Sequence, residues 1–293
     1  MDREVVVMAR WVSKALAVGP GLAVSTAVTV VVGPVLHPVA GAVIFFGGLL
    51  TEVLLLVGRG EPLAARLLMF SRPARPEELE VVAPAVTTLC AAGLGPPVIQ
   101  LRVRDRQHGI WASGAGRRTV VLSSGLIEAV ADGDLPQEQA AAVIGHAAAL
   151  TRGGWTRCDA ALAFWSLPWQ VLRTVASAVA RAGRGLPLVS FAWRMRFVVI
   201  AIAVVQNIYA GRPWLAVGIG GIGALSYAIP VWERSWQKMI LHAGDRALVD
   251  AGMAGPWAAV LRRCPRTPLT RSRLHMLEVP TSTARRLELV APR

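Results

Sequence analysis

The sequence has little charge for its length. Charged residues make up only 17% of the 293 residues, whereas hydrophobic residues make up 54%. With a mean hydropathy of +0.50, this balance is too apolar for an ordinary soluble enzyme and is typical of a membrane protein. The longest run without any charge covers residues 15–51. The lipid bilayer is therefore the first partner that the composition predicts.

Cysteine and acidic residues are also scarce, and each scarcity bears on the kind of protein that this chain can be. The chain has only three cysteines, far apart and without a C-x-x-C pair, which argues against a disulfide framework and a cysteine-rich metal site. Acidic residues are also few, so the formal net charge is +13. Because the arginines lie beside apolar runs and in the tail, and no nucleic-acid-binding motif is present, we interpret this charge as membrane anchoring. No nucleic-acid partner is expected.

Apolar runs predict four membrane-spanning helices in two hairpins. The charge-free stretch is long enough for two spans, at about 15–33 and 38–57, with a turn rich in proline and glycine between them. Basic residues flank this hairpin on both sides and are absent from its turn, so both flanks are predicted cytoplasmic. Runs 197–211 and 214–231 predict the second hairpin. The expected localisation is a multi-pass cell-membrane protein with both termini in the cytoplasm.

Residues between the hairpins have a mixed composition and predict a soluble α+β domain. Alternation at 99–105 predicts a strand, and 109–124 predicts two short strands around a Gly-Arg turn. The alanine-rich segment 135–152, opened by a proline and closed before two glycines, predicts a helix. Further helices are expected at about 76–93 and 125–133.

Two later segments complete the predicted architecture. Residues 158–180 are apolar but carry Arg173 in the middle, and an arginine at mid-bilayer costs ~2.5–3.5 kcal/mol, so we predict an interfacial helix here. A separate helix is expected at about 232–252, followed by a basic tail. The fold class is a mainly α membrane protein with a cytoplasmic domain carrying a small sheet. Its predicted parts are a hairpin (1–57), the cytoplasmic domain (58–196), a second hairpin (197–231) and a segment completing that domain (232–293).

The helix at 135–152 has the layout of a zinc-protease active-site helix with only one ligand position filled. In H-E-x-x-H, two histidines on one helix face bind zinc, and the glutamate is the general base on zinc-bound water. Here His146 takes the first position, Ala147 the glutamate position and Leu150 the second histidine position. Because a catalytic zinc needs three protein ligands, this pattern predicts the loss of both zinc and base.

The order of segments around His146 resembles the HtpX-like membrane metallopeptidases, relatives of the CAAX prenyl proteases. GIWASG (109–114) resembles the family's N-A-F-A-T-G segment, and it leads to a strand and then to the motif helix. The segment 241–247 resembles the family's E-x-x-A-D, with Leu241 at the third zinc-ligand position and Asp245 retained. WAAVLRR (257–263) and STARRLEL (282–289) resemble segments that close the family's sequence.

The resemblance implies a zincin-like domain whose metal site has decayed. In the family the aspartate orients the first histidine, so a hydrogen bond between Asp245 and His146 would be a remnant of that site. His242 is expected to point away from the ligand position beside it, which disfavours a rebuilt metal site of His146, His242 and Asp245. As in the family, a peptide is expected to bind as an added strand, along Val120, Val121 and Leu122.

Three hypotheses follow for the function. The favoured one is a catalytically inactive pseudopeptidase without cofactor, which binds polypeptides or regulates another membrane protein, as in protein quality control. The first alternative is an active membrane zinc metalloendopeptidase with atypical ligands. The second is a membrane scaffold unrelated to proteases, for which His146 and Asp245 would lie more than about 10 Å apart, too far for a hydrogen bond.

Overall fold

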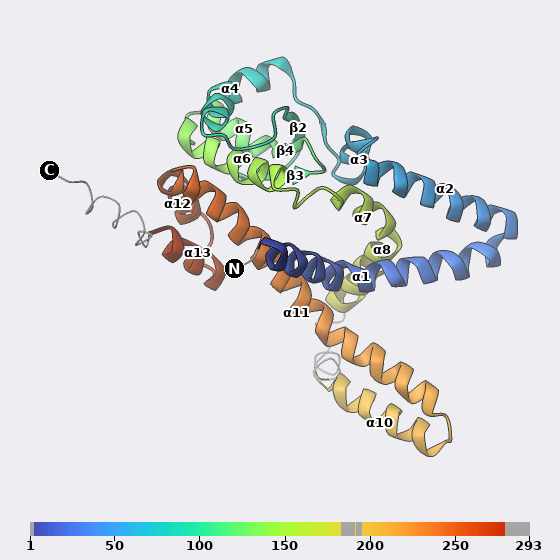
Figure 1. Ribbon diagram of the computed structural model, residues 1–293. Coiled ribbons are helices and arrows are strands. Elements are labelled where there is room, and N and C mark those ends of the chain that lie inside the picture. Colours follow the sequence, from blue (N-terminus) through green and yellow to red (C-terminus); the bar gives the residue numbers. More distant parts are fainter. Residues whose placement is uncertain (1–2, 183–190, 192–194, 279–293) are drawn as a thin grey trace. The chain divides into compact units, whose positions relative to one another are not determined.

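The computed structural model describes residues 3–182, 191 and 195–278, and these are mainly helical with one small sheet (Figure 1). The chain forms two compact units, each built from two separate stretches of sequence. Unit 1 comprises Met1–Leu50 and Leu162–Lys238, and unit 2 comprises Thr51–Ala161 and Met239–Arg293. The segment 282–289, which carries part of the family resemblance, lies outside the described residues.

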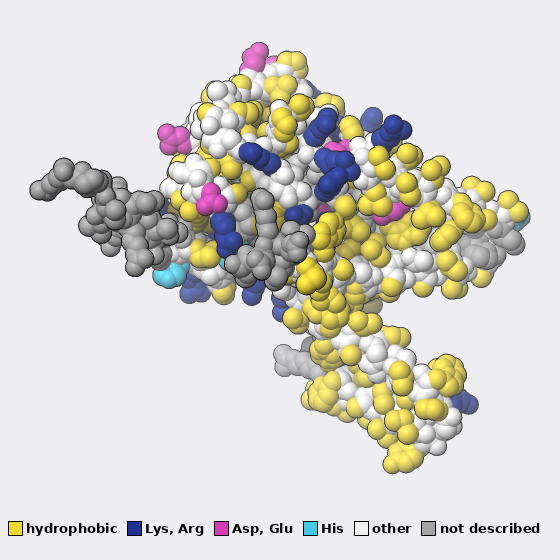
Figure 2. Space-filling model, in the orientation of Figure 1, with side chains coloured by type: hydrophobic (Ala, Val, Ile, Leu, Met, Phe, Trp, Pro, Cys, Tyr) yellow, Lys and Arg dark blue, Asp and Glu magenta, His cyan; other side chains and the backbone are white. Residues whose placement is uncertain are grey.

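Three of the described helices are long and apolar enough to cross a membrane. These helices are α1 (Arg3–Leu36), α2 (Pro38–Val57) and α11 (Pro213–Asp250). A fourth apolar helix, α10 (Arg196–Tyr209), corresponds to the remaining predicted span but has only 14 residues. The prediction of a mainly helical chain with a small sheet is confirmed, and three helices of sufficient length and hydropathy suggest a membrane protein. Exposed side chains on α2 and α10 are largely hydrophobic (Figure 2).

Two predicted helix boundaries are wrong, and both concern proline. Helix α1 continues past Pro34 to Leu36, so the turn before α2 is shorter than expected. Helix α11 continues through Pro230, where the sequence predicted a membrane span and then a separate helix. A proline inside a helix removes one backbone hydrogen bond and bends the helix, but the bonds on either side remain. Helix α11 therefore runs without interruption from an apolar half into the segment that holds Asp245.

The segment 158–180, predicted as one interfacial helix, forms two helices, and the second of them lies in unit 1. They are α7 (Asp159–Trp165) and α8 (Leu167–Ala182). The Trp165 indole N–H donates to Thr26 Oγ1 of α1 over 2.9 Å, and the Trp169 backbone N–H donates to Ser25 Oγ over 3.2 Å. Helix α8 thus lies against a helix that is long and apolar enough to span a membrane.

The sheet of unit 2 has four short strands in the order β1-β2-β4-β3. Strand β2 runs parallel to β4, and the two outer pairs are antiparallel. The three strands predicted from the sequence are present, and a two-residue β1 is added. The strands are β1 (Arg72–Pro73), β2 (Gln100–Arg104), β3 (Ala112–Ala115) and β4 (Thr119–Ser123).

The strand predicted to receive a peptide is not at an edge of this sheet. Val120, Val121 and Leu122 belong to β4, which is paired with β2 on one side and with β3 on the other. All three side chains are 0% exposed. Because both rows of β4 backbone groups already bond to neighbouring strands, the prediction of strand addition at these residues is wrong. The edge strands are β1 and β3.

Helices cover this sheet and begin where the sequence supplies caps. The Glu78 carboxylate accepts the Arg75 N–H over 2.7 Å at the start of α4, and Ser123 Oγ accepts the Leu126 N–H over 3.2 Å at the start of α5. The helices of unit 2 are α3 (Glu61–Leu68), α4 (Pro76–Ala91), α5 (Ser124–Ala131), α6 (Gln137–Arg152), α12 (Ala254–Arg263) and α13 (Pro268–Glu278), with the end of α11.

Helix α6 is the central helix of unit 2. Its residues from Ala140 to Ala148 are all buried, because alanine and glycine let neighbouring elements approach closely. On one side it packs on β3 at Gly114, where an added Cβ would lie 2.4 Å from Thr151 Oγ1. On other sides it contacts α4 and α12. This packing holds His146 in the interior of the unit.

Candidate functional site

The structure brings His146 of α6 and Asp245 of α11 together. The distance between His146 Nε2 and Asp245 Oδ1 is 3.5 Å, and His146 Nε2 also lies 3.4 Å from the Leu241 carbonyl oxygen. Both side chains are buried, with Asp245 only 2% exposed. Two segments from distant parts of the sequence, each singled out by its motif, therefore meet inside unit 2.

Two further side chains hold the Asp245 carboxylate. Arg273 of α13 binds it with two hydrogen bonds, from Nε to Oδ2 over 2.8 Å and from Nη2 to Oδ1 over 2.7 Å. The Trp257 indole N–H of α12 donates to Oδ1 over 2.7 Å. A guanidinium that binds a carboxylate with two parallel bonds is among the strongest hydrogen-bonded pairs in proteins. The buried negative charge of Asp245 is therefore fully compensated.

Two of these side chains also contact the ring of Trp257. The rings of His146 and Trp257 are stacked with centroids 5.0 Å apart, and the Arg273 guanidinium carbon lies 5.3 Å from the Trp257 ring centroid. Trp257 thus contacts each of the other three residues and joins them. We refer to His146, Asp245, Trp257 and Arg273 as the Asp245 cluster.

A glycine lets the His146 ring lie directly on α11. A Cβ added to Gly244 would stand 2.3 Å from His146 Nε2 and 2.6 Å from two ring carbons. In the E-x-x-A-D motif that this segment resembles, the same position is alanine. Glycine at position 244 removes the methyl group that would keep the imidazole away, which allows the close packing seen here.

The positions that would supply the missing ligands and base carry apolar side chains. Ala147 and Leu150 are buried in α6, at 1% and 7% exposed. Leu241 is half-buried on α11 and contributes only its carbonyl oxygen, next to His146. These three residues pack as hydrophobic side chains and add no group that binds a metal or accepts a proton.

His242 does not join the Asp245 cluster. Its side chain is half-buried, and its Nδ1 atom is buried without a hydrogen-bond partner among the described residues. Within the described ranges, no three His, Cys, Asp or Glu side chains come close enough to hold a metal ion together. The set of His146, His242 and Asp245 is included in that result, so these residues do not converge on one point.

The chemistry of the Asp245 cluster does not fit zinc. Both carboxylate oxygens of Asp245 accept bonds from Arg273, and Oδ1 accepts a third from Trp257. A zinc ion at His146 would also face the positive guanidinium of Arg273 at close range, and like charges repel strongly where water is excluded. Of the ligands that a catalytic zinc requires, only the His146 imidazole is present.

Two members of the cluster, Trp257 and Arg273, were not predicted from the sequence. Trp257 lies in a segment that carried the family resemblance, so a local signal existed, but nothing in it indicated a bond to Asp245. Arg273 lies in the arginine-rich tail, where it is one basic residue among many. No protein-family model, curated protein or solved structure matches the chain.

Proposed function

We propose that this chain is a membrane-embedded pseudopeptidase related to the HtpX-like metallopeptidases, which binds polypeptide without cutting it. The observation that carries the proposal is the 3.5 Å contact between His146 and Asp245. The resemblance led us to expect these two side chains together, although their motifs are degraded and far apart in the sequence. The scaffold alternative predicts these side chains more than about 10 Å apart, so the observed distance favours the pseudopeptidase.

The same cluster explains why the protein would not cut. Peptide hydrolysis by a zincin needs a zinc ion to activate water and a carboxylate to take its proton. The base position is Ala147, the second and third ligand positions are Leu150 and Leu241, and the remaining carboxylate is bound to Arg273. The interior that would hold the reaction centre is thus built as a hydrogen-bonded structural core.

The contact also supports four membrane crossings. Because His146 and Asp245 touch, the chain between them must cross the membrane an even number of times. The apolar half of α11 supplies one crossing, and the apolar helix α10 is the natural second one. Together with α1 and α2 this makes four spans around a zincin-like domain. The basic residues at both flanks of the first hairpin favour the cytoplasmic side for that domain.

The open edge of β3 is the proposed polypeptide-binding position. The Ser123 N–H donates to the Trp111 carbonyl, and hydrogen-bonded pairs alternate in an antiparallel ladder, so the backbone groups of Ala112 and Gly114 point to the open edge. An extended peptide can add to such an edge through main-chain bonds. The segment is GIWASG, the one that resembles the family's N-A-F-A-T-G.

Replacing Ala112 by proline tests this position. Proline removes the outward N–H at residue 112, while the bonds between β3 and β4 involve its neighbours, so the edge should tolerate it. We expect the affinity for reduced, carboxymethylated α-lactalbumin, an unfolded probe, to fall about tenfold. The variant loses one main-chain hydrogen bond to the peptide, and the proline ring occupies space at the edge. The measurement is fluorescence anisotropy on the full chain in detergent. Ser113→Ala, which leaves the backbone unchanged, is the matched control, and equal affinity in the Ala112→Pro variant would refute binding at β3.

A cleavage assay separates the pseudopeptidase from an active enzyme. We expect the full-length chain to leave the same unfolded substrate intact over many hours, with or without added zinc, because no general base is present at position 147. Fragment appearance is followed by gel and mass spectrometry. Cleavage that EDTA abolishes and zinc restores would instead support a metalloendopeptidase with atypical ligands.

A further inference from the structure

Helix α8 presents three different faces along its length. One face packs on α1, where Gly21 leaves room for the Trp169 indole: an added Cβ would lie 2.7 Å from Trp169 Cδ1. A second face is apolar and exposed, with Val171, Val175 and Val179 between 57% and 67% exposed. The third face is polar. An amphipathic helix of this kind, with arginines on its polar face, is typical of helices that lie among lipid headgroups.

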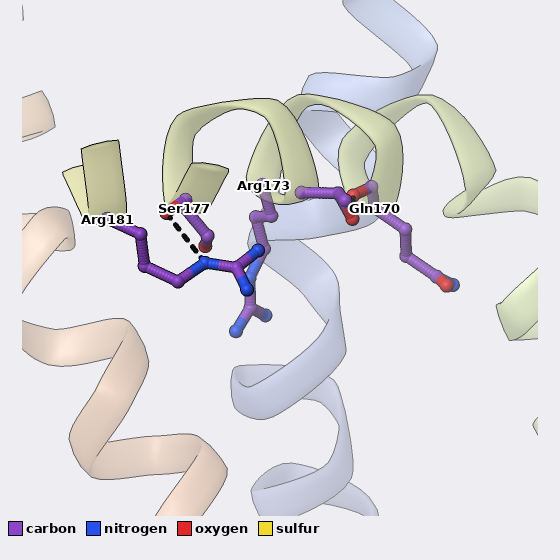
Figure 3. Close-up of a pocket in the computed structure, with 5 residues that line it drawn as sticks. Gln170, Arg173, Ser177 and Arg181 are labelled. Carbon is purple, nitrogen blue, oxygen red and sulfur yellow. Dashed lines mark hydrogen bonds between the residues drawn. The ribbon is translucent and has the colours of Figure 1, made fainter. Parts of the chain in front are cut away.

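The polar face lines a shallow pocket of about 360 Å³, formed by Gln170, Arg173, Thr174, Ser177 and Arg181 (Figure 3). No carboxylate lines this pocket. Arg181 folds back along the helix, so that its Nε donates to the Ser177 carbonyl over 3.2 Å (Figure 3). The terminal nitrogens of Arg181 and the Ser177 hydroxyl have no hydrogen-bond partner within the part of the chain that the structure describes. These donors are the groups that a phosphate needs.

The two arginines of this pocket differ in their counter-charge. Arg173 forms an ion pair with Glu233 of α11 through both terminal nitrogens, and its guanidinium carbon lies 6.0 Å from the Trp169 ring. Arg181 has no acidic partner among the described residues. The sequence explains the difference, since residues 160–232 hold six arginines and no aspartate or glutamate. Glu233 is the first acidic residue after this stretch.

The place of α8 in unit 1 indicates the source of the missing negative charge. Trp165 contacts Thr26 and Trp169 contacts Gly21, so α8 starts beside the middle of the candidate span Met8–Val32 and runs toward its N-terminal end. Arg173 and Lys14 contact α11 within one turn of each other, at Glu233 and Trp236, which places the polar face of α8 near the basic, headgroup-level end of that span. A charged arginine at membrane level is costly unless a counter-ion or headgroup accompanies it. A lipid phosphate is available there, with acyl chains for the apolar face beside it. A free phosphate would satisfy the arginines but leave the valines exposed to water.

We propose that the polar face of α8 binds the phosphate of an anionic phospholipid headgroup. Arg181 and the Ser177 hydroxyl donate to the phosphate oxygens, and the acyl chains lie along Val171, Val175 and Val179. Arg173 lines the same pocket, but Glu233 neutralises it and competes with the lipid for its guanidinium. This site is separate from the proposed polypeptide-binding edge and does not depend on it.

Lipid titration of the purified full-length chain tests the site. Binding of phosphatidylglycerol is measured by native mass spectrometry from mixed detergent micelles, with phosphatidylcholine as the neutral lipid. We expect Arg181→Gln to weaken phosphatidylglycerol binding about tenfold, the value of a charge-assisted hydrogen bond. Arg212→Gln removes the same charge from an exposed loop of the same acid-free stretch and should leave binding unchanged.

Glu233→Gln is expected to strengthen lipid binding, which loss of folding would not do. Removing this carboxylate releases Arg173 to the pocket, so phosphatidylglycerol should bind several-fold more tightly. The proposal is overturned if Arg212→Gln weakens binding as much as Arg181→Gln, if Glu233→Gln weakens binding, or if phosphatidylcholine binds equally well. In a competition experiment, millimolar inorganic phosphate is added and should not displace the lipid. Full displacement would show that the pocket takes free phosphate and would overturn its assignment to lipid.

Discussion

Replacing Arg273 by methionine is expected to destabilise the protein by about 3–5 kcal/mol, the cost of leaving one charge of a buried pair without its partner. Arg273 supplies two of the hydrogen bonds that the buried Asp245 carboxylate accepts. Methionine fills much of the same space but supplies no charge and no donor. The free energy of unfolding is measured by chemical denaturation of the full chain in detergent, followed by intrinsic fluorescence.

Two companion variants show whether the loss arises from the buried charge. Arg271→Met removes an exposed arginine from the same helix and should change the free energy of unfolding by less than about 0.5 kcal/mol. The double variant Asp245→Leu with Arg273→Met removes both charges of this buried pair, so it should recover a large part of the stability. It will not recover all of it, because the Trp257 indole N–H loses its acceptor. If Arg273→Met is no worse than Arg271→Met, the Asp245 cluster is not the structural core described above.

Replacing Gly244 by valine is the second change with a large expected effect. Even a methyl group at this position would overlap the His146 ring, with 2.3 Å between the added Cβ and Nε2. Overpacking of a core costs about 1–3 kcal/mol, and valine, with two methyl groups on its Cβ, should fall at the upper end. The imidazole would have to leave its place against α11, which breaks its stacking on Trp257.

A double-mutant cycle isolates this clash. His146→Ala removes the ring that valine would strike, so Gly244→Val should cost much less in that background than in the natural chain. Gly255→Val provides the comparison for a helical glycine without neighbours, since an added Cβ there meets nothing within 4 Å. Additive effects of Gly244→Val and His146→Ala would contradict the close contact between α6 and α11.

The sequence predicted the helices and strands of unit 2 better than their arrangement. The helix around His146 was predictable because Pro136 and Gly153 mark its ends and alanine fills its interior. Strand β4 was predictable as a strand, but its position between β2 and β3 was not. Strand order depends on pairing between distant segments, and an apolar strand in the middle of a sheet has the same local pattern as one at a covered edge.

Some residues of the candidate site could also be predicted from the sequence, and others could not. His146 and Asp245 were predictable because each stands in a motif with a recognisable order, whereas Arg273 has no local signal. The continuous α11 was missed because the change from apolar to charged residues near Glu233 resembles a helix boundary. The helix continues while its composition changes, because hydropathy depends on the surroundings of a helix and not on where the helix ends.

We propose that the frame of a zinc-protease site remains in this chain while its metal chemistry is lost. The decisive measurement is the zinc content of the purified full-length chain, determined by inductively coupled plasma mass spectrometry after equilibration with zinc and removal of excess. We expect zinc far below one ion per chain, and the same content in the His146→Ala variant. Stoichiometric zinc in the natural chain that is lost in His146→Ala would show that the metal site is intact and refute the proposal.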